Sequence, residues 1–143
     1  LPFFFQGAVM AVDEFYFHER RDLPRWERVG HPLDSLTTFI TLLIPVLLSF
    51  DSFSQKLFLS FAIFSCFFIT KDEFIHSGKC SGVEHWLHAL LFILHPLIFM
   101  ATYLLWINNP ESLFLRFQLY LVAGFMVYQI VRWNVYGTNI TNK

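Results

Sequence analysis

Carboxylate and imidazole side chains, the groups that proteins use to bind divalent metals, recur at helical spacing in two parts of this sequence. The windows 13–34 and 72–88 hold nine of the eleven Asp and Glu residues and five of the six His residues. Between apolar segments such groups are costly unless they are solvated, paired or metal-bound. The candidate metal ligands are Glu14, His18, Glu27, His31, Glu73, His76, Glu84 and His88.

The spacing places a carboxylate and an imidazole on one helix face in each pair of these residues. Residues three or four apart share a face, and three of the four pairs keep this spacing without interruption. Glu27 also lies four residues before His31, but Gly30 between them predicts a helix end, which leaves this pair open. His85, Asp13 and Asp72 fall off the shared faces and are equally compatible with ligand-supporting or interfacial roles.

Four carboxylates and four imidazoles from four helices are a reasonable ligand set for two divalent ions. Soluble di-iron bundles use Glu from two helices and Glu-x-x-His from two others. This sequence is similar to that pattern in Glu73-x-x-His76 but richer in histidine, because Glu14 and Glu84 are followed by His four residues later. A mixed nitrogen and oxygen set favours iron, with zinc second. The simpler interpretation, interfacial residues paired with arginines, fits any single pair better than it fits the duplicated set.

The composition predicts an all-α integral membrane protein with five transmembrane helices in one domain, 1–143. Hydrophobic residues make up 55% of the chain and charged residues only 15%, far from a soluble average. A short interfacial helix is expected from Asp22 to Gly30, a turn at 51–56, and a capping box from Ser81 to Glu84 that starts the fourth long helix. The five long helices are expected at 2–18, 31–50, 57–70, 84–107 and 113–136.

The two ligand windows also predict an internal repeat of a helical hairpin. Glu27 and His31 precede Glu84 and His88 by 57 residues. Repeat 1 would span 2–50 and repeat 2 would span 57–107, together forming a four-helix bundle, with the extra helix 113–136 outside it. Most Lys and Arg lie in the loops that follow the first and third helices. The chain is therefore expected in a bacterial inner membrane, with its N-terminus outside and its C-terminus cytoplasmic.

These observations favour a membrane-embedded di-metal enzyme, with iron preferred, that oxidises or hydroxylates a lipid or other apolar small substrate with the help of a redox partner. Two alternatives keep the metal: a zinc-dependent membrane hydrolase and a structural subunit that metal holds together. A metal or proton transporter is a further alternative, but only His95 and Gln118 lie at depth. His95 is best interpreted as a core histidine held by hydrogen bonds. No basic patch indicates nucleic acid.

Overall fold

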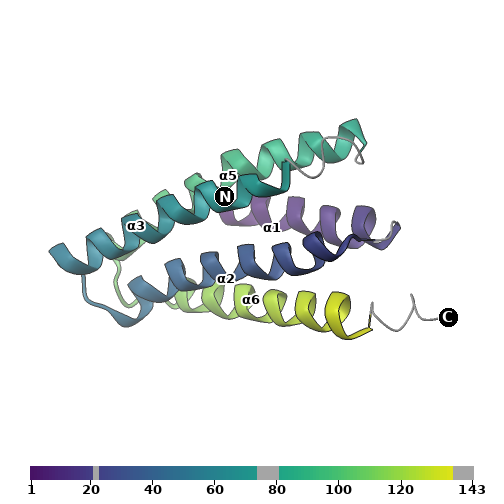
Figure 1. Cartoon of the computed structure of the whole chain (residues 1–143). Coiled ribbons are helices and arrows are strands. Elements are labelled where there is room, and N and C mark those ends of the chain that lie inside the picture. The colour runs from purple at the N-terminus through teal and green to yellow at the C-terminus, as the bar shows by residue number, and fades with distance from the viewer. Residues whose placement is uncertain (21–22, 74–80, 137–143) are drawn as a thin grey trace.

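Helices account for all the regular structure in the computed structural model, which describes residues 1–20, 23–73 and 81–136 (Figure 1). The α-helices of these residues are α1 (Pro2–Val12), α2 (Arg25–Leu47), α3 (Ser52–Phe68), α5 (Gly82–Asn108) and α6 (Leu113–Gln129). α1 continues into a π-helical turn, Asp13–Phe17, and then a 3-10 turn, His18–Arg20. α3 ends in the 3-10 turn Ile69–Asp72, and α6 continues as the π-helix Ile130–Tyr136.

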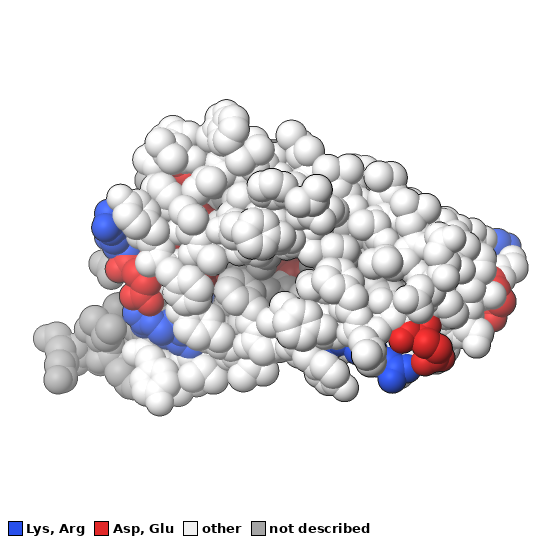
Figure 2. Space-filling model, turned by 180° about the vertical axis from the view of Figure 1, so that it is seen from behind, with Lys and Arg blue, Asp and Glu red and all other residues white. Residues whose placement is uncertain are grey.

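Four of the helical segments have the length and hydropathy that a membrane span requires. They are Arg25–Leu47, Ser52–Lys71, Gly82–Asn108 and Leu113–Tyr136. α1, with 11 residues, is not among them, since it extends only about 16 Å. In Figure 2, charged side chains gather toward the two ends of the molecule and leave an almost uncharged band between them. The chain is therefore compatible with an integral membrane protein, and four of the five predicted spans have the required length.

α2 lies between two neighbours, because it packs along α3 on one side and along α6 on the other (Figure 1). α1 packs along α5, and α3 also contacts α5, which joins the two groups of helices. The prediction that segment 113–136 lies outside the core is wrong. α6 packs along α2, and its Gln129 is buried against Glu14 of the first helical segment.

Two helices start where a side chain just before the helix caps its first backbone N–H groups. The predicted cap at Ser81 is confirmed, since its side chain accepts a hydrogen bond from the Glu84 backbone N–H at 3.3 Å. The predicted turn at 51–56 is wrong beyond its first residue. Asp51 caps the backbone N–H groups of Phe53 and Ser54, so α3 already begins at Ser52.

The predicted helix end at Gly30 is also wrong, because α2 runs unbroken through Gly30 and Pro32. Pro32 lacks an N–H group and therefore leaves the carbonyl of Arg28 without its usual helical donor. The side chain of Asn134 donates to that carbonyl at 2.9 Å. The helix continues because a distant residue replaces the missing hydrogen bond, and Glu27 and His31 consequently share one helix face.

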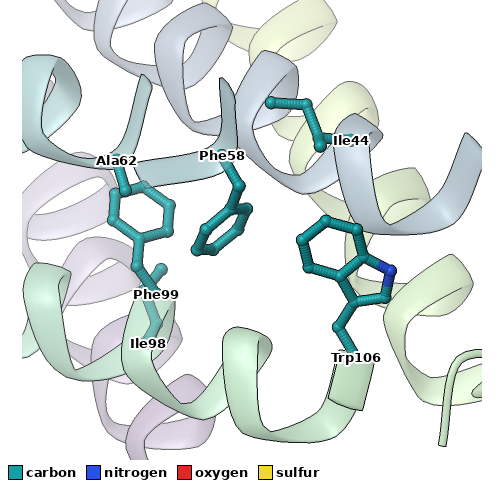
Figure 3. Close-up of a cluster of buried hydrophobic side chains, with 6 residues drawn as sticks. All are labelled: Ile44, Phe58, Ala62, Ile98, Phe99 and Trp106. Atoms are coloured by element: carbon teal, nitrogen blue, oxygen red, sulfur yellow. The ribbon is translucent and has the colours of Figure 1, made fainter. Parts of the chain in front are cut away.

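An aromatic core closes the end of the bundle at which α2 and α5 terminate (Figure 3). Phe58 and Trp106 are almost fully buried and pack against each other with ring centroids 5.8 Å apart. The Trp106 indole N–H donates to the Leu48 carbonyl at 3.2 Å, which satisfies the end of α2. The ligand windows lie at the opposite ends of these helices, so packing and candidate chemistry are separated along the bundle.

Candidate metal centre

The structure brings carboxylate and imidazole groups from three helical segments into two overlapping clusters: the segment that begins with α1, then α2 and α5. Asp13, His18, Glu84 and His88 are all buried and offer ligand atoms that lie within 4.8 Å of one another. His18 also belongs to a second group with the same spacing, whose other members are Glu27 and His31. The two groups therefore form one continuous cluster with His18 at its centre.

Asp13 lies between two histidines and directs one carboxylate oxygen at each of them. Its Oδ2 is 3.4 Å from His18 Nε2, and its Oδ1 is 3.4 Å from His88 Nε2. Two donors bound to one ion at about 2.1 Å with tetrahedral angles lie roughly 3.4 Å apart. Within the described part of the chain, neither buried ring nitrogen of His18 has a hydrogen-bond partner. The spacing therefore suits a shared ion better than it suits a direct hydrogen bond.

The π-helical turn explains why Asp13 and His18 face the same site. In this turn the backbone N–H of His18 bonds to the carbonyl of Asp13, five residues earlier. A π-helix thus aligns residues five apart, whereas an α-helix aligns residues three or four apart. The α-helical spacing assumed for the sequence placed Asp13 off the shared face, and the wider turn brings it into the cluster.

Glu14 lies beside the two clusters, where donors from the C-terminal segment of α6 hold its carboxylate. The amide of Gln129 donates to Glu14 Oε2 at 3.2 Å, and the Trp133 indole N–H donates to Oε1. Gln129 is itself oriented by Ser35, which donates to its carbonyl oxygen at 2.7 Å. His18 Nδ1 lies 3.6 Å from Glu14 Oε2. Gln129 and Trp133 are site residues that the ligand spacing could not indicate, because neither is a typical metal ligand.

The surroundings of the two acids in the π-turn favour their charged forms. Burial by itself would raise the pKa of Asp13, but the contact with His88 and the charges of neighbouring histidines hold that pKa below its ordinary value. Burial opposes the charge of Glu14 in the same way, and its contacts with His18, Trp133 and Gln129 lower its pKa. The cluster therefore presents anionic oxygen atoms, the form that binds cations.

The eight predicted ligands divide into four groups. Five of them lie together in the clusters: His18, Glu27, His31, Glu84 and His88. Glu14 is their buried neighbour. The side chain of Glu73 is 48% exposed and lies 3.6 Å from His85, and neither residue belongs to the two clusters. His76 lies outside the described residues. That any of these residues binds a metal stays a prediction.

A cavity of about 720 Å³ adjoins the cluster between α1, α2, α5 and α6. Its volume falls within the range of small-molecule sites, roughly 300–1,000 Å³. Asp13, Glu14, His31 and His88 line one part of the cavity, and most of the remaining wall is aliphatic or aromatic. Figure 2 shows a hollow on this apolar surface, and atoms of Asp or Glu (red) are visible inside it. The candidate ligands therefore face an apolar space.

Comparisons with known proteins do not add to this description. No protein family, curated protein or solved structure matches the chain. The buried cluster and its cavity are consequently the features from which a function must be argued.

Proposed function

We propose that this chain is a membrane-embedded di-metal enzyme that oxidises a lipid or another apolar substrate. The observation that carries the proposal is the position of the Asp, Glu and His cluster in the wall of an apolar cavity. A cluster used only as a structural clamp has no need of an adjoining apolar space. A catalytic centre does need one, because the substrate must reach the metal.

Two ions, with iron preferred, agree with the division of the ligands. Asp13, Glu84 and His88 form one side of the cluster, and Glu27 and His31 form the other, with His18 between them. The mixed carboxylate and imidazole set suits iron. Bound iron would supply oxidation chemistry with dioxygen as the oxidant, and a separate redox partner would supply electrons. The chain itself would position the substrate and exclude water through the apolar wall.

A zinc-dependent hydrolase is the second candidate, and Glu14 is the observation that favours it. This carboxylate is buried, charged and held by Gln129 and Trp133 at the edge of the cavity. Zinc lowers the pKa of a bound water, and a neighbouring carboxylate in this position would act as the general base. In the oxidation proposal, Glu14 instead supports His18 from 3.6 Å.

The proposal includes a duplicated hairpin and a defined membrane orientation. In such a repeat, α1 corresponds to α3 and α2 corresponds to α5. The contact of α1 with α5 then corresponds to the contact of α3 with α2, and both contacts are present. The Lys and Arg distribution supports a bacterial inner membrane, an external N-terminus and a cytoplasmic C-terminus. The metal cluster would then lie near the cytoplasmic face.

Elemental analysis of the purified protein tests the proposal, with two histidines of one helix as the matched pair. We expect iron at about two ions per chain, as in di-iron bundles. His88→Ala should lose most of this iron, whereas His85→Ala should retain it, because His85 pairs with Glu73 and belongs to neither cluster. Zinc in place of iron would support the zinc-dependent hydrolase instead of the oxidation enzyme. Absence of both metals from wild type reconstituted with each would contradict the two enzyme proposals.

A further inference from the structure

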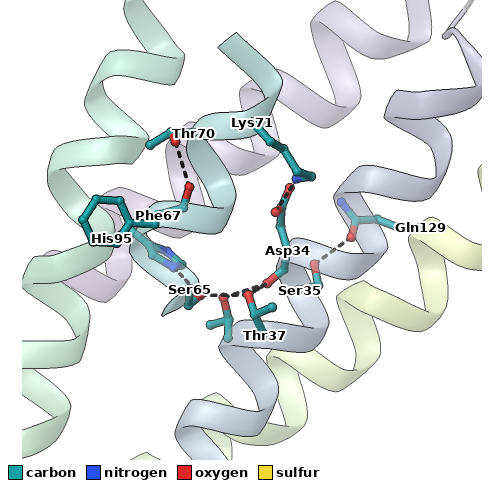
Figure 4. Close-up of polar contacts among 10 residues, drawn as sticks. Asp34, Ser35, Thr37, Ser65, Phe67, Thr70, Lys71, His95 and Gln129 are labelled. Carbon is teal, nitrogen blue, oxygen red and sulfur yellow. Dashed lines mark hydrogen bonds and ion pairs between the residues drawn. The ribbon is translucent and has the colours of Figure 1, made fainter. Parts of the chain in front are cut away.

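A line of polar side chains crosses the apolar interior and ends at the cavity. Thr37 on α2 donates to the Asp34 carbonyl at 2.9 Å and lies 2.8 Å from the Ser65 hydroxyl of α3. Ser65 Oγ lies 2.9 Å from His95 Nε2 on α5 (Figure 4). The other ring nitrogen of His95 lies 3.2 Å from Gln6 Nε2 on α1. The prediction that His95 is a hydrogen-bonded core residue is therefore confirmed.

The anchored end of this line fixes the direction of every hydrogen bond in it. The Thr37 hydroxyl has one proton and donates it to the Asp34 carbonyl, so in the contact between Thr37 and Ser65 the donor must be Ser65. Ser65 then accepts from His95, which places the ring proton on Nε2 and makes Nδ1 an acceptor. Gln6 must therefore present its amide N–H₂ to His95, and its carbonyl Oε1 points elsewhere.

Gln6 Oε1 has no hydrogen-bond partner among the described residues, although the Gln6 side chain is buried. The residue is only 8% exposed, and both Gln6 and His95 line the cavity. A buried carbonyl oxygen requires a donor. Because no described residue donates to this oxygen and Gln6 lines the cavity, a molecule in the cavity that carries a donor would satisfy it.

We propose that the cavity binds a long-chain molecule that carries a hydroxyl or amide N–H group, and that this group donates to Gln6 Oε1. The alkyl part fits the apolar wall, which includes Leu91, Phe92 and Phe117. Gln6 precedes Asp13 by seven residues on one helical segment, about 10 Å at the α-helical rise. If the cluster binds metal as proposed above, this contact would place beside the metal a carbon of the ligand that lies about 10 Å from the donor group.

Competition binding on metal-free protein in lipid nanodiscs tests this ligand class without requiring any activity. The probes are radiolabelled hexadecanol, its methyl ether and hexadecane, which share a chain and differ in the donor. The wild-type protein should bind the alcohol about tenfold more tightly than the ether, as expected for one buried hydrogen bond. Gln6→Leu should bind all three probes with similar affinity. Gln55→Leu, which changes a glutamine bonded to Tyr103 and absent from the cavity lining, should keep the preference.

Two outcomes would overturn the proposal. Equal binding of alcohol and ether by wild type would mean that water alone meets Gln6 Oε1. Loss of the preference in Gln118→Leu but not in Gln6→Leu would move the contact to α6. If Gln6→Leu does not fold, the wild-type comparison of alcohol with ether still decides. Because the protein is metal-free, failure here leaves the metal-centre proposal intact, and failure of that proposal leaves this result intact.

Discussion

At the scale of single residues, the candidate centre includes Asp13, which α-helical spacing did not indicate as a ligand. It does not include Glu73, which the same spacing did indicate. Asp13 lies within 3.4 Å of both His18 and His88. Glu73 is half-exposed and contacts His85. The two acids offer the same carboxylate chemistry, so only their positions distinguish them. A metal-binding measurement on matched substitutions therefore tests the geometry of the site directly.

Asp13→Asn should lower metal affinity by roughly 100-fold or more, because even residues that only support metal ligands change affinity by about 10–100-fold. Glu73→Gln should change it little. Titration of the metal-free variants with Fe²⁺, followed by competition with a chelator of known affinity, measures both values. Equal losses in the two variants, or loss in Glu73→Gln alone, would contradict the cluster described here.

The acids and histidines of the site could be predicted from the sequence, but the residues that hydrogen-bond to them could be predicted only in part. The repeated carboxylate and imidazole spacing indicated five residues that the fold brings together, His18 and His88 among them. Gln129 and Trp133 could not be found in this way. They act by donating hydrogen bonds to Glu14 across more than 110 residues of sequence, and nothing in local spacing indicates such a contact.

At the scale of elements, a helix start is predictable where a local cap determines it, as the cap at Ser81 shows. Asp51 also accepts hydrogen bonds from backbone N–H groups within three residues, but the polar residues after it favoured a turn, so the start of α3 was missed. The continuity of α2 through Pro32 was not predictable, because the compensating donor is the side chain of Asn134. The π-turn at Asp13–Phe17 was missed for a related reason: its five-residue alignment has no compositional marker.

The π-turn should matter to the site more than to the fold, and a one-residue insertion tests this. Tyr16 lies in the turn and is 48% exposed. An alanine inserted after Tyr16 would place His18 six residues after Asp13, a spacing that neither a π-turn nor an α-helix aligns. We expect a large loss of bound metal with little change in Tm. Tyr16→Ala, which keeps the chain length, should retain the metal. Metal loss in both variants would assign the effect to the side chain.

At the scale of the whole molecule, α6 changes the architecture that the apolar segments suggest. Five apolar runs and two similar windows favour a four-helix bundle with one additional helix. The packing instead places α6 along α2, and Trp133 of the π-helix that follows donates a hydrogen bond to Glu14 of the first helical segment. Arg132 in this π-helix forms an ion pair with Glu19 at 2.6 Å, next to His18. Hydrophobicity identified the helix, but side-chain contacts between distant residues decide where it packs.

The separation of the aromatic core from the candidate metal centre predicts that stability and metal binding can be changed independently. Trp106 is fully buried at the far end of the bundle and contacts Phe50, Phe58 and the Leu48 carbonyl. Trp106→Ala should cost about 3–5 kcal/mol of stability, as for other buried aromatic residues. Its metal content, measured on the folded protein, should stay at the wild-type level.

Chelation of wild type should give the converse result. Ligand loss lowers apparent stability only by the binding free energy that is linked to folding, and the apolar packing around Trp106 does not involve the cluster. We expect metal removal to lower Tm by much less than Trp106→Ala does, with helical circular dichroism unchanged at low temperature. Melting curves of both proteins in one detergent, with and without chelator, make the comparison. If the chelator unfolds wild type outright, the cluster holds the bundle together, because metal binding energy would then supply much of the folding energy.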